Sequence, residues 1–166
     1  MSWYTAAVDD RVKVAAPVCG TATIASHVCK RTIEGHCDCM FWINNRMWDL
    51  TDVGALIAPR PLLIASAVRD WIFDIDSVRL IYHKLKRLYE TMGAPENIAL
   101  VETPGGHSYH EKSRRMIFQW FLKHLKGVNV PLEDVGDIDE TQEPLEALRV
   151  FTSSIPADEK VTTVQE

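Results

Sequence analysis

The chain has 166 residues, 46% of them apolar and 25% charged, with a formal net charge of -5 at pH 7. This composition excludes disorder throughout and is typical of one globular domain with a modest core. Lysine and arginine form no block that would neutralise a row of phosphates, so we expect no nucleic-acid partner.

The sequence carries no sign of a membrane span or a secretory signal. No run approaches the roughly 18 to 20 apolar residues that cross a bilayer, and no basic segment with an apolar core follows Met1. We therefore expect no membrane partner, and the compartment stays unassigned. Four cysteines are too few for a disulfide scaffold in a chain of this length, which leaves the redox compartment open.

Three stretches predict β-strands. Arg11 to Val18 is apolar and β-branched and stops at a Cys-Gly pair. Arg60 to Ala67 is a nearly continuous apolar run opened by a proline, as is typical of a parallel strand covered on both faces. Glu96 to Pro104 is the third stretch.

Helices are predicted after the second and third strands. Residues 76–93 have apolar side chains at helical spacing, with Asp76 as the expected N-cap and Gly93 at the end. A second apolar stripe follows the third strand and ends at Gly127. Shorter helices are expected at 24–33 and 52–57. Strands alternating with helices predict an α/β fold with parallel strands.

The composition changes after Gly127. Residues 128–166 are acidic and contain prolines, without a helical stripe of useful length. We therefore divide the chain into a domain at 1–127 and a tail or linker at 128–166.

Functional groups of a parallel sheet collect beyond the carboxyl ends of its strands. Asp70, Asp74 and Asp76 follow the second strand, and His107 follows the third on a Pro-Gly-Gly turn. A carboxylate and a histidine in this order are the orienting acid and general base of a nucleophile-His-acid triad. Asp70 is the predicted acid because it is closest to the strand end, and Asp74 is the next candidate. A helix cap and a solvated surface histidine are the competing interpretation.

The order and spacing of these segments resemble a known enzyme family. "ALIAPRPLLIASAVRDW", "LVETPGGHSYH" and, further upstream, "DDRVKVAAPVCG" and "GHCDCMFWIN" are similar to the C-terminal half of α/β-hydrolases of the acetyl xylan esterase and glucuronoyl esterase type. These are relatives of the dienelactone hydrolase and prolyl oligopeptidase group. The resemblance covers roughly residues 3–127 and implies a three-layer, partial α/β-hydrolase fold. It also implies that Asp70 and His107 are catalytic.

The chain departs from that family in one respect. Such enzymes carry a Gly-x-Ser-x-Gly nucleophile elbow, and this sequence contains none. We therefore expect a truncated form that carries only the acid and the histidine and is inactive alone. The strand at Arg11 to Val18 would then be an unpaired edge through which two copies associate.

The resemblance implies hydrolysis of a carbohydrate ester, with no cofactor and no metal. Trp42 and Trp48 are candidates for stacking on sugar rings, although such aromatics are more often part of a core. If the substrate is a polysaccharide, we expect the parent enzyme to be extracellular or periplasmic. A rival interpretation is a zinc site that includes His36, Cys37 and Cys39. A non-catalytic module and a peptidase of the prolyl oligopeptidase type are two further interpretations of the same sequence.

Overall fold

The computed structural model describes residues 1–33, 44–138, 142–151, 153, 154 and 156. In chain order the helices and strands are α1 (Ser2–Val8), α2 (Ile24–Lys30), α3 (Leu50–Ala55), β1 (Leu62–Ala67), α4 (Ile75–Thr91), β2 (Ile98–Thr103) and α5 (Glu111–Lys126). Short 3₁₀ turns lie at η2 (Pro95–Asn97) and η3 (Leu132–Asp134).

The sheet is parallel, as predicted. β1 and β2 pair in register from Leu62 opposite Ile98 to Ala67 opposite Thr103. All six residues of β1 are buried, which confirms that this strand is covered on both faces. α4 makes the connection between the two strands and packs back onto both of them.

The first predicted strand is present only in part. Two isolated parallel bridges, at Ala15 and Val18, join this segment to the free edge of β1. The amides of Ala15 and Cys19 donate to β1 and its flank, but position 17 is a proline. Because proline has no amide hydrogen, the rung that residue 17 would donate is missing and the ladder is interrupted.

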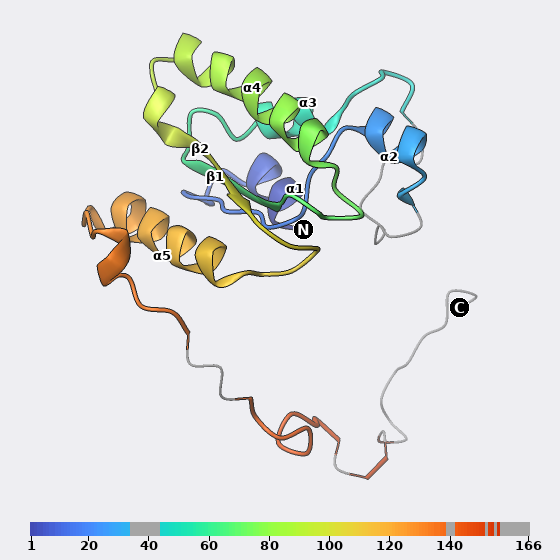
Figure 1. Ribbon diagram of the computed structural model, residues 1–166, viewed down its shortest axis with the longest axis vertical. Helices are drawn as coiled ribbons and strands as arrows, with labels where there is room; N and C mark the ends of the chain where they lie inside the picture. Colours follow the sequence, from blue (N-terminus) through green and yellow to red (C-terminus); the bar gives the residue numbers. More distant parts are fainter. Residues whose placement is uncertain (34–43, 139–141, 152, 155, 157–166) are drawn as a thin grey trace.

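Helices cover the two faces of the sheet, as Figure 1 shows with α1, α3 and α4 on one side and α5 on the other. Side chains of β1 alternate between the two layers because successive residues of a strand point to opposite faces. Leu62 and Ile64 join the larger core under α1, α3 and α4, whereas Leu63 and Ala65 join the smaller core under α5. The three-layer α/β architecture predicted from the sequence is therefore confirmed.

The N-cap of helix α4 lies two residues earlier than predicted. Asp74, not Asp76, is the N-cap, and its carboxylate accepts a hydrogen bond from the amide of Ser77 at 3.1 Å. Asp76 lies inside the first turn, where it forms an ion pair with Arg79 at 2.9 Å. The side chain of either aspartate can cap a helix. Asp74 is the cap because its backbone lies outside the helix, whereas the backbone of Asp76 is helical.

Residues after α5 pack against that helix. Gly127 ends α5 in the left-handed conformation, with φ of 69°. Arg115 then donates to the carbonyl oxygens of Leu132 and Val135, and Arg114 Nε donates to Asp137 at 2.7 Å. The stretch up to residue 137 is thus held on α5, while the division of the chain at Gly127 stays a prediction.

Among the described residues, no helix is long and apolar enough to cross a bilayer.

Gly54 allows α3 to approach α1 and α4 closely. A Cβ atom at this position would lie 2.5 Å from a ring carbon of Trp3 and 2.9 Å from a methyl group of Leu85, both of which are buried. We expect Gly54→Ala to lower the free energy of unfolding by about 1–3 kcal/mol, since a packed core accommodates extra volume only with strain. Urea unfolding measures this. Gly136→Ala is the control because its Cβ would meet nothing within 4 Å, and equal losses in both variants would contradict the prediction.

Candidate active site

The loops that follow β1 and β2 are joined to each other beyond the strands. The amide of Val68 donates to the carbonyl oxygen of Thr103, and the amide of Arg69 donates to that of Gly105, both at 2.9 Å. The parallel register has already placed the two strand ends side by side. Residues that follow β1 and β2 are therefore brought to one corner of the sheet.

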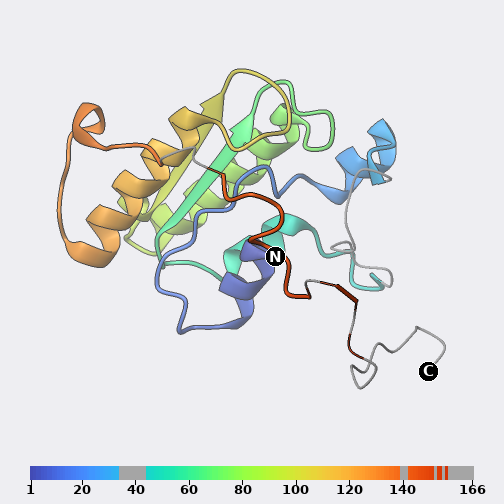
Figure 2. The ribbon, with the colours of Figure 1, turned by 90° about the horizontal axis from the view of Figure 1, so that it is seen from below.

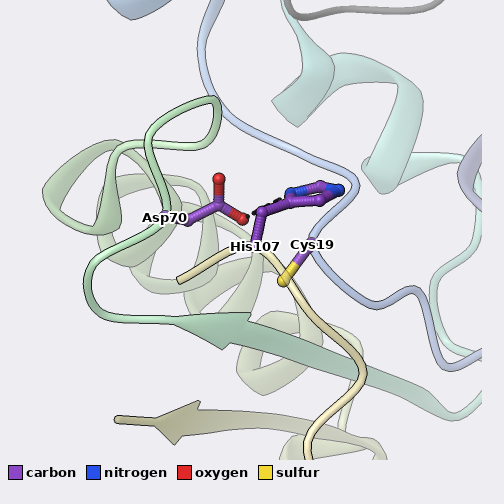
Figure 3. Close-up of side chains that lie close together, drawn as sticks. All are labelled: Cys19, Asp70 and His107. Carbon is purple, nitrogen blue, oxygen red and sulfur yellow. Dashed lines mark hydrogen bonds and ion pairs between the residues drawn. The ribbon is translucent and has the colours of Figure 1, made fainter. Parts of the chain in front are cut away.

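Asp70 and His107 are in direct contact at this corner. His107 Nδ1 and Asp70 Oδ2 are 2.8 Å apart, and Figure 3 shows the imidazole beside the carboxylate. The Asp70 side chain is fully buried, whereas that of His107 is 41% exposed. The other carboxylate oxygen accepts hydrogen bonds from the amides of Ile72 and Phe73, at 2.8 and 3.2 Å. The carboxylate is therefore fixed on three sides, and the imidazole is open to a reactant.

His107 is held from a second direction by an aromatic ring. Phe73 stacks on the imidazole with ring centroids 5.8 Å apart and an interplanar angle of 22°. His27, which is fully buried, meets the edge of Phe73 at 5.6 Å. Among the residues that the structure describes, Nε2 of His107 has no hydrogen-bond partner. The ring is thus oriented by Asp70 and Phe73 and leaves one nitrogen available.

The turn before His107 requires only one of its two glycines. Gly105 has φ of 106°, and a Cβ there would lie 2.9 Å from the ring of His110. Gly106 has an ordinary φ, and its Cβ would meet only a backbone oxygen at 3.9 Å. His110 Nε2 closes the turn at 3.0 Å from the carbonyl oxygen of Gly106. The conformation of the turn therefore depends on a glycine at 105 and not at 106.

Cys19 is a third side chain at this corner, and the sequence analysis did not place it there. Its thiol donates to the carbonyl oxygen of Ser108 at 3.7 Å, and one ligand atom each of Cys19, Asp70 and His107 lie within 4.8 Å of one another. Burial raises the pKa of the Cys19 thiol, so the protonated form is favoured. The available signal was its position at the end of the first predicted strand, because side chains after all three strands meet at the same edge.

The other residues singled out from the sequence lie elsewhere. Trp48 lines an open, apolar pocket of about 600 Å³ between α1 and α3, whose lining includes neither Asp70 nor His107. Trp42 and the predicted zinc ligands His36, Cys37 and Cys39 lie outside the described residues. The sugar-stacking role of both tryptophans stays a prediction. Asp74, the second candidate for the acid, is occupied as the cap of α4 and pairs with Lys30.

Comparison with known proteins gives relatives that are all longer than this chain. No family model matches it. It is 30% identical over 111 residues to "Putative hydrolase YtaP" of Bacillus subtilis. The aligned region covers 64% of this chain and 36% of that protein.

Solved structures with a similar fold include a glucuronoyl esterase of carbohydrate esterase family 15 from Caldicellulosiruptor kristjansonii. Its TM-score is 0.63 at 18% identity, over 86% of this chain and 44% of that chain. Methylesterase BT1017 has a TM-score of 0.61 at 23% identity, over 89% of this chain and 32% of that chain.

The chain thus spans less than half the length of each of these proteins. Its fold is similar to theirs over most of its own length, with parallel strands between helices. The chain has the fold of one part of an α/β-hydrolase.

Proposed function

We propose that Asp70 and His107 are the orienting acid and the general base of a carboxylic ester hydrolase that acts on carbohydrate esters. The observation that carries the proposal is the 2.8 Å contact between His107 Nδ1 and a buried carboxylate, with the opposite ring nitrogen open. This is the arrangement that lets an imidazole take a proton from a nucleophile while the acid holds its tautomer.

The chemistry follows from the two ring nitrogens. Asp70 accepts the hydrogen on Nδ1, so Nε2 carries the lone pair. Nε2 then takes the proton of a serine hydroxyl as its oxygen attacks the acyl carbon, and returns that proton to the departing alcohol oxygen. Water then attacks the acyl-enzyme through the same proton transfers, and the carboxylic acid product is released. Asp70 remains charged throughout and stabilises the imidazolium that forms twice in each cycle.

The nucleophile in this proposal is a serine outside the 166 residues. The sequence contains no Gly-x-Ser-x-Gly elbow, and the chain spans under half of its longer relatives. Cys19 is a nucleophilic side chain beside the pair, but burial raises the pKa of its thiol, and a thiol is weakly nucleophilic compared with a thiolate.

The substrate class is supported by the names of the structural neighbours, which include glucuronoyl esterases and a methylesterase. These neighbours are under 25% identical to the chain, so they support the fold directly and the carbohydrate ester only by analogy. Acetyl and uronoyl esters are therefore both included in the test.

The test compares ester hydrolysis by the 166-residue chain with hydrolysis by the chain extended through the coding sequence upstream of Met1. Substrates are p-nitrophenyl acetate, a methyl glucuronate ester and, for the peptidase interpretation, an aminoacyl p-nitroanilide. We expect the extended protein to hydrolyse the esters and the 166-residue chain to remain near the uncatalysed rate. His107→Ala should lower kcat by about 10⁶-fold in the extended protein.

His83→Ala is the matched control, because His83 is an exposed histidine on α4 and should leave kcat unchanged. If the extended protein hydrolyses only the anilide, the peptidase interpretation replaces the esterase proposal. If it hydrolyses none of the substrates, the interpretation as a non-catalytic module is favoured. Turnover by the 166-residue chain that disappears in His107→Ala would show that the nucleophile lies within these residues.

A further inference from the structure

Three side chains that bind transition metals converge at the carboxyl end of the sheet. They are the thiol of Cys19, the carboxylate of Asp70 and the imidazole of His107, and they come from three separate segments of the chain, as Figure 3 shows. Among the described residues, this is the one group of three Cys, His, Asp or Glu side chains whose ligand atoms come together within 4.8 Å. We propose that these three side chains form a binding site for Zn²⁺ or a similar divalent cation.

The donor set matches the chemistry of zinc. Zn²⁺ is of borderline softness and binds cysteine sulfur, histidine nitrogen and carboxylate oxygen, and sites with three protein ligands leave a fourth position for water. Groups made of exposed carboxylates are common on protein surfaces without binding a metal. Here, in contrast, Cys19 is 7% exposed and the side chain of Asp70 is fully buried. The exposed ligand is His107, so the open position would face solvent.

The backbone at Cys19 is consistent with this proposal, although Arg31 and Met47 share its positive φ away from the site. Cys19 has φ of 44°, in the left-handed region that residues other than glycine seldom adopt. Gly20 follows it and could take that conformation at lower cost, yet its φ is not positive. Backbone strain at residues other than glycine occurs often at functional sites. The side chain of Cys19 points toward the other two ligands.

The ligand atoms need only small shifts to bind the cation. Bonds of about 2.0 to 2.3 Å to a tetrahedral Zn²⁺ place ligand atoms about 3.3 to 3.8 Å apart. Asp70 Oδ2 and His107 Nδ1 are 2.8 Å apart and would separate slightly, while the sulfur would move inward. His107 is half exposed on a glycine-containing turn, so it is the ligand that can adjust.

Protons balance in this exchange. Binding at Nδ1 moves the hydrogen of the neutral imidazole to Nε2, and the Cys19 thiol releases its proton to solvent, so one proton is released for each cation bound. Asp70 is already a carboxylate acceptor of two backbone amides and keeps those hydrogen bonds through Oδ1. Oδ2 becomes the metal ligand.

The inference stands without the proposed ester hydrolysis, because it concerns binding alone. If both hold, the cation and the Nδ1 hydrogen compete for the same place, and Zn²⁺ inhibits the hydrolase by occupying its acid and base. A binding measurement without a turnover readout separates the failure of one proposal from the failure of the other.

The test is equilibrium dialysis of the reduced 166-residue chain against Zn²⁺, with metal and protein determined by elemental analysis. Co²⁺ is a second probe because a cobalt–thiolate bond absorbs in the near ultraviolet. We expect the Cys19→Ser and His107→Ala variants each to weaken Zn²⁺ binding by more than about 100-fold, since even partners outside the ligand set cost 10-fold to 100-fold. His107 is exposed, so its variant tests the site without a packing cost, and circular dichroism checks the fold of both.

Two control variants complete the design. Cys29→Ser replaces an exposed cysteine that is not in the group, and it should bind Zn²⁺ as the unaltered chain does. The double variant Cys37→Ser with Cys39→Ser removes the two thiolate ligands of the rival site predicted from the sequence and should also bind normally. Retention of Zn²⁺ and of the cobalt absorption in folded Cys19→Ser, or their loss in the double variant, would overturn the proposal, as would the absence of binding in the unaltered chain.

Discussion

Asp70→Asn is expected to lower kcat/KM of the ester-hydrolysing protein by about 10⁴-fold without unfolding it. The asparagine Oδ1 can keep the hydrogen bonds from the amides of Ile72 and Phe73. The group facing His107 then becomes an NH₂ donor where a carboxylate oxygen accepted. Nδ1 has to accept, the hydrogen moves to Nε2, and the nitrogen that should take the proton of the nucleophile can no longer do so.

The measurement is steady-state hydrolysis by the extended protein, with urea unfolding of each variant alongside. Asp76→Asn is the matched control, since Asp76 is an exposed aspartate in the first turn of α4 and pairs with Arg79. It should change kcat/KM by less than about twofold, in keeping with the small contribution of exposed ion pairs. Equal activity of Asp70→Asn and Asp76→Asn would exclude Asp70 as the acid.

Arg60→Met is expected to lower the free energy of unfolding by about 3 kcal/mol, because hydrogen bonds from a charged group are among the strong ones. The guanidinium of Arg60 donates to four backbone carbonyl oxygens, at distances from 2.7 to 3.1 Å. The accepting residues lie on α1, on the chain that leaves it and after α3: Ala6, Asp9, Val12 and Leu56. Arg60 thus joins three segments directly before β1.

Methionine keeps the apolar stem of Arg60 and removes all its donors, so the comparison isolates the hydrogen bonds. Arg60→Lys keeps the charge with fewer donors in a different geometry and should have intermediate stability. Arg69→Met is the control at an exposed arginine near the end of β1, where we expect a change within about 0.5 kcal/mol. A variant Arg60→Met as stable as the original protein would show that water replaces the guanidinium without cost.

The sequence predicted those elements whose signal is local. A continuous apolar run predicted β1, and the glycine after α5 predicted the end of that helix. Because residues that follow parallel strands meet at one edge of the sheet, the sequence also predicted that Asp70 and His107 lie close together. The cap of α4 was wrong because Asp74 and Asp76 carry the same side chain, and only the backbone conformation of Asp74 distinguishes them. The interruption of the first strand was not predictable in the same way. It arises because the backbone nitrogen of Pro17 faces β1, and that orientation is set by the pairing with β1.

Cys19 shows what local signals cannot give. Its place beside His107 depends on a left-handed φ at a residue followed by a glycine, where the glycine is the expected site of such a conformation. Trp48 lies in a pocket with Tyr4 and Val53 of helices α1 and α3, a grouping that its own sequence neighbourhood does not indicate, and its role in sugar stacking stays a prediction.

The β1–α4–β2 crossover is one continuous unit, as the two views in Figures 1 and 2 show, and Asp70 and His107 lie on the loops that follow its two strands. Thirty-seven positions separate Asp70 from His107 in the chain, and the loops that carry them are hydrogen-bonded to each other. Their mutual distance is therefore set by a single supersecondary unit. In the proposed mechanism, a nucleophile from outside the crossover meets a pair whose geometry is already set, so the segment that supplies it can vary in length and sequence without changing the contact between Asp70 and His107.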